Sequence, residues 1–288
     1  MSQNSPQVPW SDEQWARAKK AVLDEAQRAR VAGKFLPLFG PLPGSADFVR
    51  AEGMTYGDAG KPGQRMRIDD TRVIQLATLQ VKVYVRGAQM ADPEMTSALQ
   101  LFRRAANVLA RLEDAVVFNG QRGPGEGPAA GLDGLPGIWD VLGGQAGAGL
   151  FGEAGQQLGL TDEGGLVRTV SEAIGMIEGQ GHFGPFAVVL GQELFSLAQT
   201  PNKDSLVLPQ DRILPFLGGG PLLRSSSLPA ASGLVVALGA APVELVVATD
   251  MSLMFLQLTT DPQFVFRVHE KIALRIREAS AILAINPA

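Results

Sequence analysis

The stretch LQVKVYVR, residues 79–86, decides how the fold is built around it. Its apolar side chains at every second position alternate with polar ones, and a repeat of two predicts a β-strand with one buried face. Upstream, the Gly/Pro-rich segment YGDAGKPGQR, residues 56–65, predicts a turn. We therefore expect residues 50–86 to form a long hairpin that projects from the body. An isolated hairpin is marginally stable in water, so this arm needs a partner to cover it.

A long helix is predicted directly after the hairpin. Asp92 followed by Pro93 at the first helical position is a start signal, and Asn119 with Gly120 is a stop signal. At about 1.5 Å per residue this helix is about 40 Å long, enough to serve as the spine of a domain. Its apolar face carries Met95, Leu99, Phe102, Ala106, Leu109 and Val116.

Upstream of the hairpin, an amphipathic helix is predicted to begin at Ser11. Ser11 and Gln14 fit a capping box, Trp10 and Trp15 fit a hydrophobic staple, and Gly33 is the expected stop. The apolar stripe is thin and rich in alanine, so we expect the helix to lie across another surface as a docking element. The following segment is interrupted by three prolines and is expected to run extended.

The rest of the chain alternates between irregular and regular segments. Residues 120–165 hold 16 of the 34 glycines and are expected to be connection and loop. Within them GAGLFG, residues 147–152, matches a dinucleotide fingerprint, but no clear strand leads into it, so we interpret it as loop. Residues 166–200 predict a small helix–strand–helix unit, and residues from 233 onward predict successive strands. The pattern indicates an α+β protein of two lobes, with the middle of the chain inserted into the first lobe.

Composition limits the functions that the chain can serve. Of its 288 residues 45% are hydrophobic and 19% are charged, which favours a subunit that hides surface against copies of itself. The net charge of −4 argues against nucleic acid as a partner. With no cysteine, disulfides and thiolate metal sites are excluded. The sequence shows no signal peptide and no apolar run of membrane-spanning length, so we expect a cytoplasmic protein that does not enter a membrane.

Candidate catalytic groups are scarce. Nucleophile-elbow, Walker A and zinc-protease motifs are missing, and the two histidines, His182 and His269, lie far apart in sequence without visible catalytic partners. Glu113 and Asp114 are adjacent and point in different directions on a helix, so we expect a solvated or intersubunit charge pair. His269 is expected on the polar face of its strand. We therefore predict no enzyme activity, no catalytic residue, no metal and no cofactor.

Five stretches, taken in order, resemble the encapsulins, the shell proteins of bacterial and archaeal nanocompartments. Each stretch is weakly specific by itself, and their collinear order over nearly the whole chain carries the resemblance. They are GKFLPLFGP after the helix that contains Trp15, LEDAVVFNG, GHFGPFAVVLG, ATDMSLMFL and QFVFRVHEKIALRI. In this family His182 falls at a variable place in a glycine-rich turn before a strand, so the resemblance gives it no catalytic role.

The resemblance implies an α+β, tailed-phage major capsid protein-like fold with a P-domain, an A-domain and an extended E-loop. It also implies a large closed icosahedral shell made of copies of this chain. The expected parts are residues 1–43 as the cargo-docking helix and its connection, 44–90 as the E-loop hairpin, 91–125 as the P-domain spine helix, 126–231 as the A-domain and 232–288 as the terminal P-domain strands.

The resemblance further implies that the shell encapsulates a cargo enzyme through a C-terminal targeting peptide bound on its inner face. The implied binding positions are Lys34, Phe35, Leu36, Leu38, Asp250, Met251, Ser252, Leu253, Met254 and Phe255. A charge placed at Leu253 is expected to lower cargo loading and leave particles intact. Pro37 and Leu38 stand where relatives tend to have an acidic residue, so the peptide motif is expected to differ.

The A-domain tip is expected to surround a pore for small molecules, lined by Asn202, Lys203, Asp204 and Ser205. Some relatives bind flavin near the hairpin; Tyr84 is the one aromatic residue on the returning strand, and flavin is not carried over to this chain.

Two other functions stay open on the sequence. A prophage-derived major capsid protein that packages DNA has the same fold. A soluble enzyme that uses the glycine-rich region for a phosphate-bearing ligand predicts a small oligomer and a convergent polar pocket.

Overall fold

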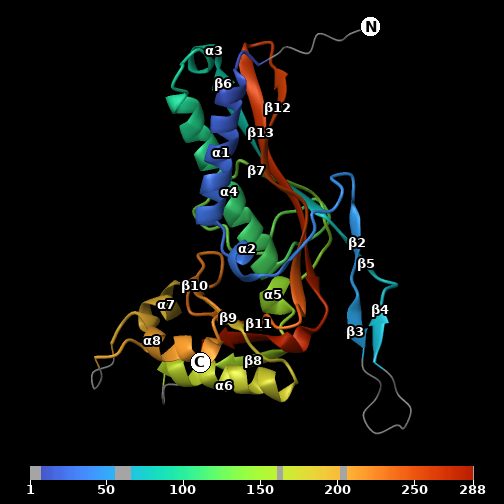
Figure 1. Cartoon of the computed structure of the whole chain (residues 1–288), viewed down its shortest axis with the longest axis vertical. Helices are drawn as coiled ribbons and strands as arrows, with labels where there is room; N and C mark the ends of the chain where they lie inside the picture. The colour runs from blue at the N-terminus through green and yellow to red at the C-terminus, as the bar shows by residue number, and fades with distance from the viewer. Residues whose placement is uncertain (1–7, 56–65, 161–164, 202–205, 288) are drawn as a thin grey trace.

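The computed structural model describes residues 8–55, 66–160, 165–201 and 206–287. They form two lobes, each built on a five-stranded sheet, with a narrow arm beside the first lobe (Figure 1). Outside the sheets, the helices are α1 (Asp12–Ala29), α2 (Ala32–Phe35), α3 (Gly87–Met90), α4 (Thr96–Asn119), α5 (Gly149–Gly152), α6 (Gly165–Gly179), α7 (Gln192–Ala198), α8 (Pro209–Ile213), η1 (Leu214–Leu217) and η2 (Ala279–Ala281).

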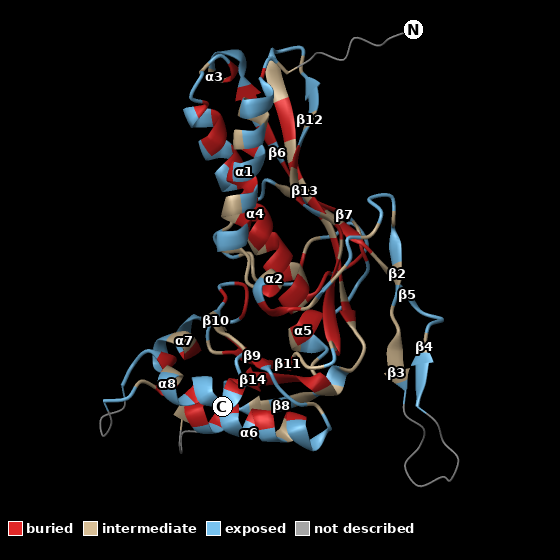
Figure 2. Cartoon of the chain, in the orientation of Figure 1, coloured by how far each residue is buried: buried red, intermediate tan, exposed pale blue. Residues whose placement is uncertain are grey.

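The first sheet is made of two long strands and three shorter ones, in the order β1-β12-β13-β6-β7. Helices α1 and α4 cover one of its faces, and strand β13 beside them is coloured mostly as buried or intermediate (Figure 2). The alternation in residues 79–86 is confirmed, because Leu79, Val81 and Val85 are buried on that face. The strands are β1 (Leu38–Phe39), β6 (Ala77–Arg86), β7 (Trp139–Gly143), β12 (Val243–Leu258) and β13 (Gln263–Ile276).

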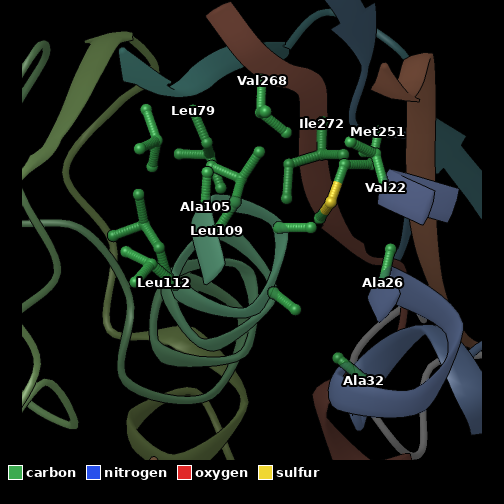
Figure 3. Packing of buried hydrophobic residues seen from close by; sticks show 14 of the residues in the cluster. Val22, Ala26, Ala32, Leu79, Ala105, Leu109, Leu112, Met251, Val268 and Ile272 are labelled. Atoms are coloured by element: carbon green, nitrogen blue, oxygen red, sulfur yellow. The ribbon is translucent and has the colours of Figure 1, made fainter. Parts of the chain in front are cut away.

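The spine helix α4 begins later than predicted. It starts at Thr96 rather than at Pro93, because Met95 has a left-handed backbone conformation with a φ of 56° and the residues before it form a turn. Asp92 still serves the helix start, since its carboxylate accepts the backbone N–H of Thr96 at 3.0 Å. The buried face of α4 contacts both the first sheet and α1. Its residues Ala105, Leu109 and Leu112 are labelled in Figure 3.

The second lobe contains the sheet β10-β9-β11-β14-β8, with α6, α7 and α8 packed on it. Its strands are β8 (Gln156–Gly159), β9 (Phe186–Leu190), β10 (Leu222–Arg224), β11 (Gly233–Ala237) and β14 (Ile282–Asn286). Strands β9 and β11 are buried along their whole length. Strand β9 lies in the inserted lobe, as predicted, but a run of five buried apolar residues looks the same in either lobe, and for this reason β11 was assigned to the wrong one.

The expected lobe boundaries therefore need two corrections. Residues 232–288 are not all in the first lobe, since β11 and β14 pair with each other and with strands of the second sheet. Strand β7, expected in the inserted lobe, pairs with β6 at the edge of the first sheet. The chain thus passes between the lobes more often than the simple insertion predicted.

The arm is a hairpin in two parts and is shorter than predicted, because β6, expected as its returning strand, lies between β13 and β7 in the first sheet. Strand β2 (Phe48–Arg50) pairs with β5 (Val73–Gln75), and β3 (Gly53–Thr55) pairs with β4 (Arg67–Asp69). The predicted tip, residues 56–65, lies outside the described residues. In Figure 1 the arm stands apart from the helices, on the other side of the long strands.

A buried arginine fastens the base of the arm to the first sheet. Arg275 of β13 is fully buried, donates to Glu244 of β12, and donates to Glu52 of the arm at 3.2 Å. Its guanidinium also lies over the ring of Phe39, 4.0 Å from the centroid. A charge-assisted network of this kind fixes the orientation of the bonded groups as well as holding them in contact.

The glycine-rich segment makes close backbone turns. Gly120 has a φ of 74°, and a Cβ there would lie 1.9 Å from the carbonyl oxygen of Gly147. The two backbones are joined where the N–H of Gly147 donates to Gln121 at 3.0 Å. Glycine is therefore required for this approach, with no ligand needed to explain it.

Candidate functional site

Helix α1 lies on the first lobe and is held at its N-terminal end by aromatic rings. Trp10 stacks on Phe266 with ring centroids 5.0 Å apart, and it meets Trp15 edge-on at 5.4 Å. The indole N–H of Trp10 donates to the carbonyl of Met90 at 3.4 Å. The expected staple and the Ser11–Gln14 capping box are both confirmed.

The C-terminal end of α1 is held by a buried carboxylate on α4. The carboxylate of Asp114 accepts the backbone N–H of Val31 at 2.9 Å and that of Ala32 at 2.7 Å. These bonds satisfy two backbone donors at the start of α2 that have no partner within the helix. Burial, and then the neighbouring Glu113, raise the pKa of Asp114 to about 8. These bonds attach the α1–α2 junction directly to the spine helix.

Beside Asp114, three further carboxyl groups surround Arg30, the residue after α1. Its guanidinium lies 3.6 Å from Glu113 of α4, 3.1 Å from Asp250 of β12 and 3.9 Å from Glu270 of β13. Glu113 and Glu270 are buried, and burial raises the pKa of each of them. Burial alone would lower the pKa of Arg30, but the carboxylates outweigh it and raise this pKa.

The prediction that Glu113 and Asp114 form a solvated or intersubunit pair is wrong. Both are buried within one chain, because the α1–α2 junction covers this turn of α4. Gly33, expected to stop α1, lies inside α2, where a Cβ would come within 2.7 Å of the Arg30 side chain. The sequence held one unused signal: two adjacent acids in the otherwise apolar stretch LEDAVVF.

On the α2 side, the implied peptide-binding residues divide between surface and core. Lys34 is exposed, and its ammonium donates to the carbonyl of Arg28 at 2.9 Å. Phe35 and Leu36 are buried, and the ring of Phe35 stacks on Phe118 at 6.3 Å. Leu38 is 60% exposed in β1, at the edge of the first sheet.

On the β12 side, strand alternation separates the implied residues. Met251 and Leu253 are buried beneath α1, and Figure 3 shows Met251 and Val22 of α1 at the same interior. Met254 is 43% exposed and its sulfur accepts from Arg267 at 3.4 Å.

The remaining members of this stretch also differ in their surroundings. Asp250 is exposed beside Arg30, Ser252 contacts His269, and Phe255 is half-buried against Phe264 and Phe266. Residues 250–255 therefore do not line one groove. Leu253 belongs to the core, so a charge there is expected to disrupt the fold and not only the loading of cargo.

The implied pore residues Asn202, Lys203, Asp204 and Ser205 lie outside the described residues. The segment on each side of them is described: α7 ends at Ala198, and α8 begins at Pro209. Between them Leu206 is 98% exposed and Val207 is 51% exposed. The described residues Leu206 and Val207 therefore lie at the surface of the second lobe.

Each histidine has a neighbour that the sequence did not indicate. His182 lies 2.8 Å from the hydroxyl of Ser280 and 3.9 Å from Glu278, both through Nε2. In a catalytic triad the nucleophile and the acid use opposite ring nitrogens, so this set is not a triad. His269 lies on the more exposed face of β13, as predicted, next to Ser252.

The glycine-rich segment borders a hollow of about 580 Å³ between the arm and the body. The helix that begins there, α5, has four residues, and one turn does not supply the aligned amides of a phosphate site. Within the described ranges no group of His, Asp and Glu is arranged to hold a metal ion. In the same ranges the helices lack the length and apolarity needed to cross a membrane.

A long spine helix packed with a docked N-terminal helix on one sheet, a second lobe and a projecting arm define the class of capsid-like shell proteins. Structural comparison agrees: the chain is similar to the virus-like particle from Pyrococcus furiosus, with a TM-score of 0.64 and 16% identity over 95% of this chain and 100% of that one. It is also similar to the holo-SrpI encapsulin complex from Synechococcus elongatus PCC 7942, with a TM-score of 0.58 and 12% identity over 99% and 92% of the two chains. For Gordonia phage Cozz the TM-score is 0.59 with 12% identity, over 89% and 85%.

Sequence comparison places the chain within that class. Residues 2–273 match the family model described as encapsulating protein for peroxidase. The chain is 27% identical to the type 1 encapsulin shell protein EncA of Myxococcus xanthus (strain DK1622), over 97% of this chain and 94% of that protein. The chain belongs to the encapsulin family, and it is a shell-forming subunit of a protein nanocompartment.

Proposed function

We propose that copies of this chain enclose a cargo enzyme, and that the cargo's C-terminal peptide binds beside the α1–α2 junction on the inner wall. The docked position of α1 carries the proposal, because both of its ends are fixed on the first lobe. Family membership supports it, since the matching family model is described as an encapsulating protein for peroxidase. The same proposal locates the shell in the cytoplasm.

The exposed members of the implied set define the proposed binding surface. Lys34 and Asp250 place one charge of each sign at the junction, and Leu38 adds an exposed apolar side chain nearby in the sequence. A peptide side chain buried there contributes about 1.5 to 3 kcal/mol before ordering costs, so a single site binds modestly. Many identical sites on one wall raise the overall affinity through multivalency.

Cargo loading tests this surface. The probe is a fluorescent protein that carries the C-terminal segment of the enzyme encoded beside the shell gene, produced together with the shell. Asp250→Lys should lower the fluorescence per purified particle by about tenfold, because it reverses a charge at the proposed site. Glu193→Lys, which makes the same reversal of charge at an exposed position on α7 of the second lobe, is the matched control. Equal loading of both variants and the natural protein would refute the site.

A pore through the second lobe belongs to the same proposal. The loop between Thr200 and Leu206 carries Asn202, Lys203, Asp204 and Ser205, and polar side chains in a constriction select by size and charge. Lys203→Glu should slow the entry of an anionic quencher to an enclosed fluorophore and leave the entry of a neutral quencher unchanged. Equal anion entry in both proteins would remove these residues from the pore.

A DNA-packaging capsid is the second candidate, because the fold is also that of Gordonia phage Cozz. The net charge of −4 favours a protein cargo over nucleic acid. Nuclease-treated particles decide between the two. Protected DNA of uniform length would support packaging, and particles free of DNA support encapsulation of protein.

A further inference from the structure

The cluster at the α1–α2 junction contains more buried acid than its cations can balance. The charged groups that face one another there come from every element packed at the junction. They are Arg30 after α1, Lys34 of α2, Glu113 and Asp114 of α4, Asp250 of β12 and Glu270 of β13.

Arg30 is the central cation of this cluster. In the described part of the chain it is the one cation within 4.0 Å of either Glu113 or Glu270. Lys34 acts on Asp114, and it is exposed to solvent. One arginine therefore faces two fully buried glutamates, and its Nη2 also donates a hydrogen bond to Asp250 at 3.1 Å.

The oxygens of the two glutamates show how the cluster is balanced. Both carboxylate oxygens of Glu113 and one of Glu270 are buried and receive no hydrogen bond from any N–H donor. A buried charge without a partner is costly, and two carboxyl groups in contact avoid this cost by holding one proton between them. The carboxyl groups of Glu113 and Glu270 lie against the same guanidinium, 3.6 Å from Nε and 3.9 Å from Nη2 of Arg30, so the two acids are neighbours around one cation.

We propose that Glu113 and Glu270 share one proton, and that loss of this proton at alkaline pH releases the α1–α2 junction from the spine helix. With both glutamates ionised, two like charges remain buried beside a single arginine. Opening the junction admits water to them and lowers their repulsion.

The opening is local because the two ends of α1 are held by different chemistry. The N-terminal end is held by Trp10, Trp15 and Phe266, which do not titrate in this range. Asp114 belongs to the end that opens, since it accepts the N–H groups of Val31 and Ala32. The junction therefore works as a proton-dependent latch, and the aromatic end works as its pivot.

The latch deepens the proposed function, because the proposed peptide surface includes Lys34 and Asp250 of this cluster. Only this consequence, that cargo binding weakens as the latch opens, rests on the proposed function. The opening itself is measured on empty particles, so its failure and the failure of the cargo site give different results.

Hydrogen–deuterium exchange of assembled empty particles tests the latch between pH 6 and pH 9.5. Rates are divided by the intrinsic exchange rate at each pH, and helix α6 of the second lobe serves as the internal standard. Protection of residues 26–36 should fall at least about tenfold relative to α6 as pH rises. A constant ratio over this range would overturn the proposal, even with no variant made.

Two variants give opposite predictions. Glu270→Gln removes one of the competing carboxyl groups, so the pH midpoint for loss of protection should rise by at least about one unit. Arg30→Met leaves even one ionised carboxyl in the closed junction without a cation, so the junction should already open when the first proton is lost, and the midpoint should fall. Asp140→Asn, which removes a half-exposed carboxylate on β7, is the control and should leave the midpoint unchanged.

The midpoints of these variants can overturn the proposal in a second way. An unchanged midpoint in Glu270→Gln, or a rise in Arg30→Met, would contradict a shared proton. If Glu270→Gln does not fold, Glu113→Gln removes the other partner of the same pair and carries the same expectation.

Discussion

Replacement of Arg275 by methionine should weaken the attachment of the arm more than any surface change of similar size. Arg275 is fully buried and is shared between Glu244 of the sheet and Glu52 of the arm. Methionine keeps much of the side-chain volume and its contact with Phe39, but it leaves Glu244 buried without its main cation. Arg277 still contacts Glu244 at 3.0 Å, so part of the charge stays balanced.

The size of the effect follows from burial. Removing one partner of a buried ion pair costs about 3 to 5 kcal/mol, since the other charge stays out of water. For a chain of this size each kcal/mol lowers the unfolding midpoint by about 2 to 4 °C, so Arg275→Met should lose about 6 to 20 °C. Arg103→Met, at an exposed position on α4, should change stability by less than about 0.5 kcal/mol.

A double-mutant cycle measures the pair itself. Glu244→Gln, introduced together with Arg275→Met, removes the unpaired charge and should recover at least about 2 kcal/mol of the loss. The assay is thermal unfolding of assembled particles at one fixed heating rate, because large assemblies unfold irreversibly. The reasoning is refuted if Arg275→Met unfolds within about 2 °C of the natural protein, or if the losses of the two single variants simply add.

Three further predictions test the core, the buried acids and the glycine turns. Leu253→Asp should abolish soluble protein because Leu253 is buried, whereas Met254→Asp should still form particles; equal yields would contradict the strand orientation. The pKa of Asp114 is about 8 in the folded chain and 3.8 ordinarily, so the folded chain binds more protons than the unfolded chain between these values. The free energy of unfolding should therefore fall as pH rises across this window, by about 1.4 kcal/mol per pH unit. Urea titrations measure this slope, and Asp114→Asn should flatten it. Gly120→Ala should cost more than about 2 kcal/mol in the same assay, while Gly134→Ala, with a similar φ and open space around it, should cost about 1 kcal/mol; equal losses would show that the clash with Gly147 is not the cause.

Periodic segments were predictable from the sequence, and segments without a period were not. The alternation in residues 79–86 and the capping box at Ser11 depend on neighbours in the sequence, so local pattern was enough to place them. Strands β11 and β14 are buried on both faces and show no alternation. Their assignment to the second sheet depends on pairing with strands far away in the sequence, which no local pattern records.

The candidate site was harder to predict for a similar reason. A run of implied contacts such as residues 250–255 ignores the alternation of a strand, which sends neighbouring side chains to opposite faces. The acids Glu113 and Asp114 looked like surface residues because charged residues usually are. Only the docking of α1 and α2 over this turn of α4 makes them buried, and that contact joins segments about 80 residues apart in the sequence.

The order of the strands has a consequence for the growing polypeptide on the ribosome. Strands β12 and β13 occupy the middle of the first sheet, and β14 lies between β11 and β8 in the second. All three come from residues 243–286, after every other strand of the two sheets, so neither lobe can complete its core until this segment has left the ribosome. Until then, nascent subunits lack finished surfaces with which to join their neighbours, and wall construction waits for residues 243–286 to fold into both sheets.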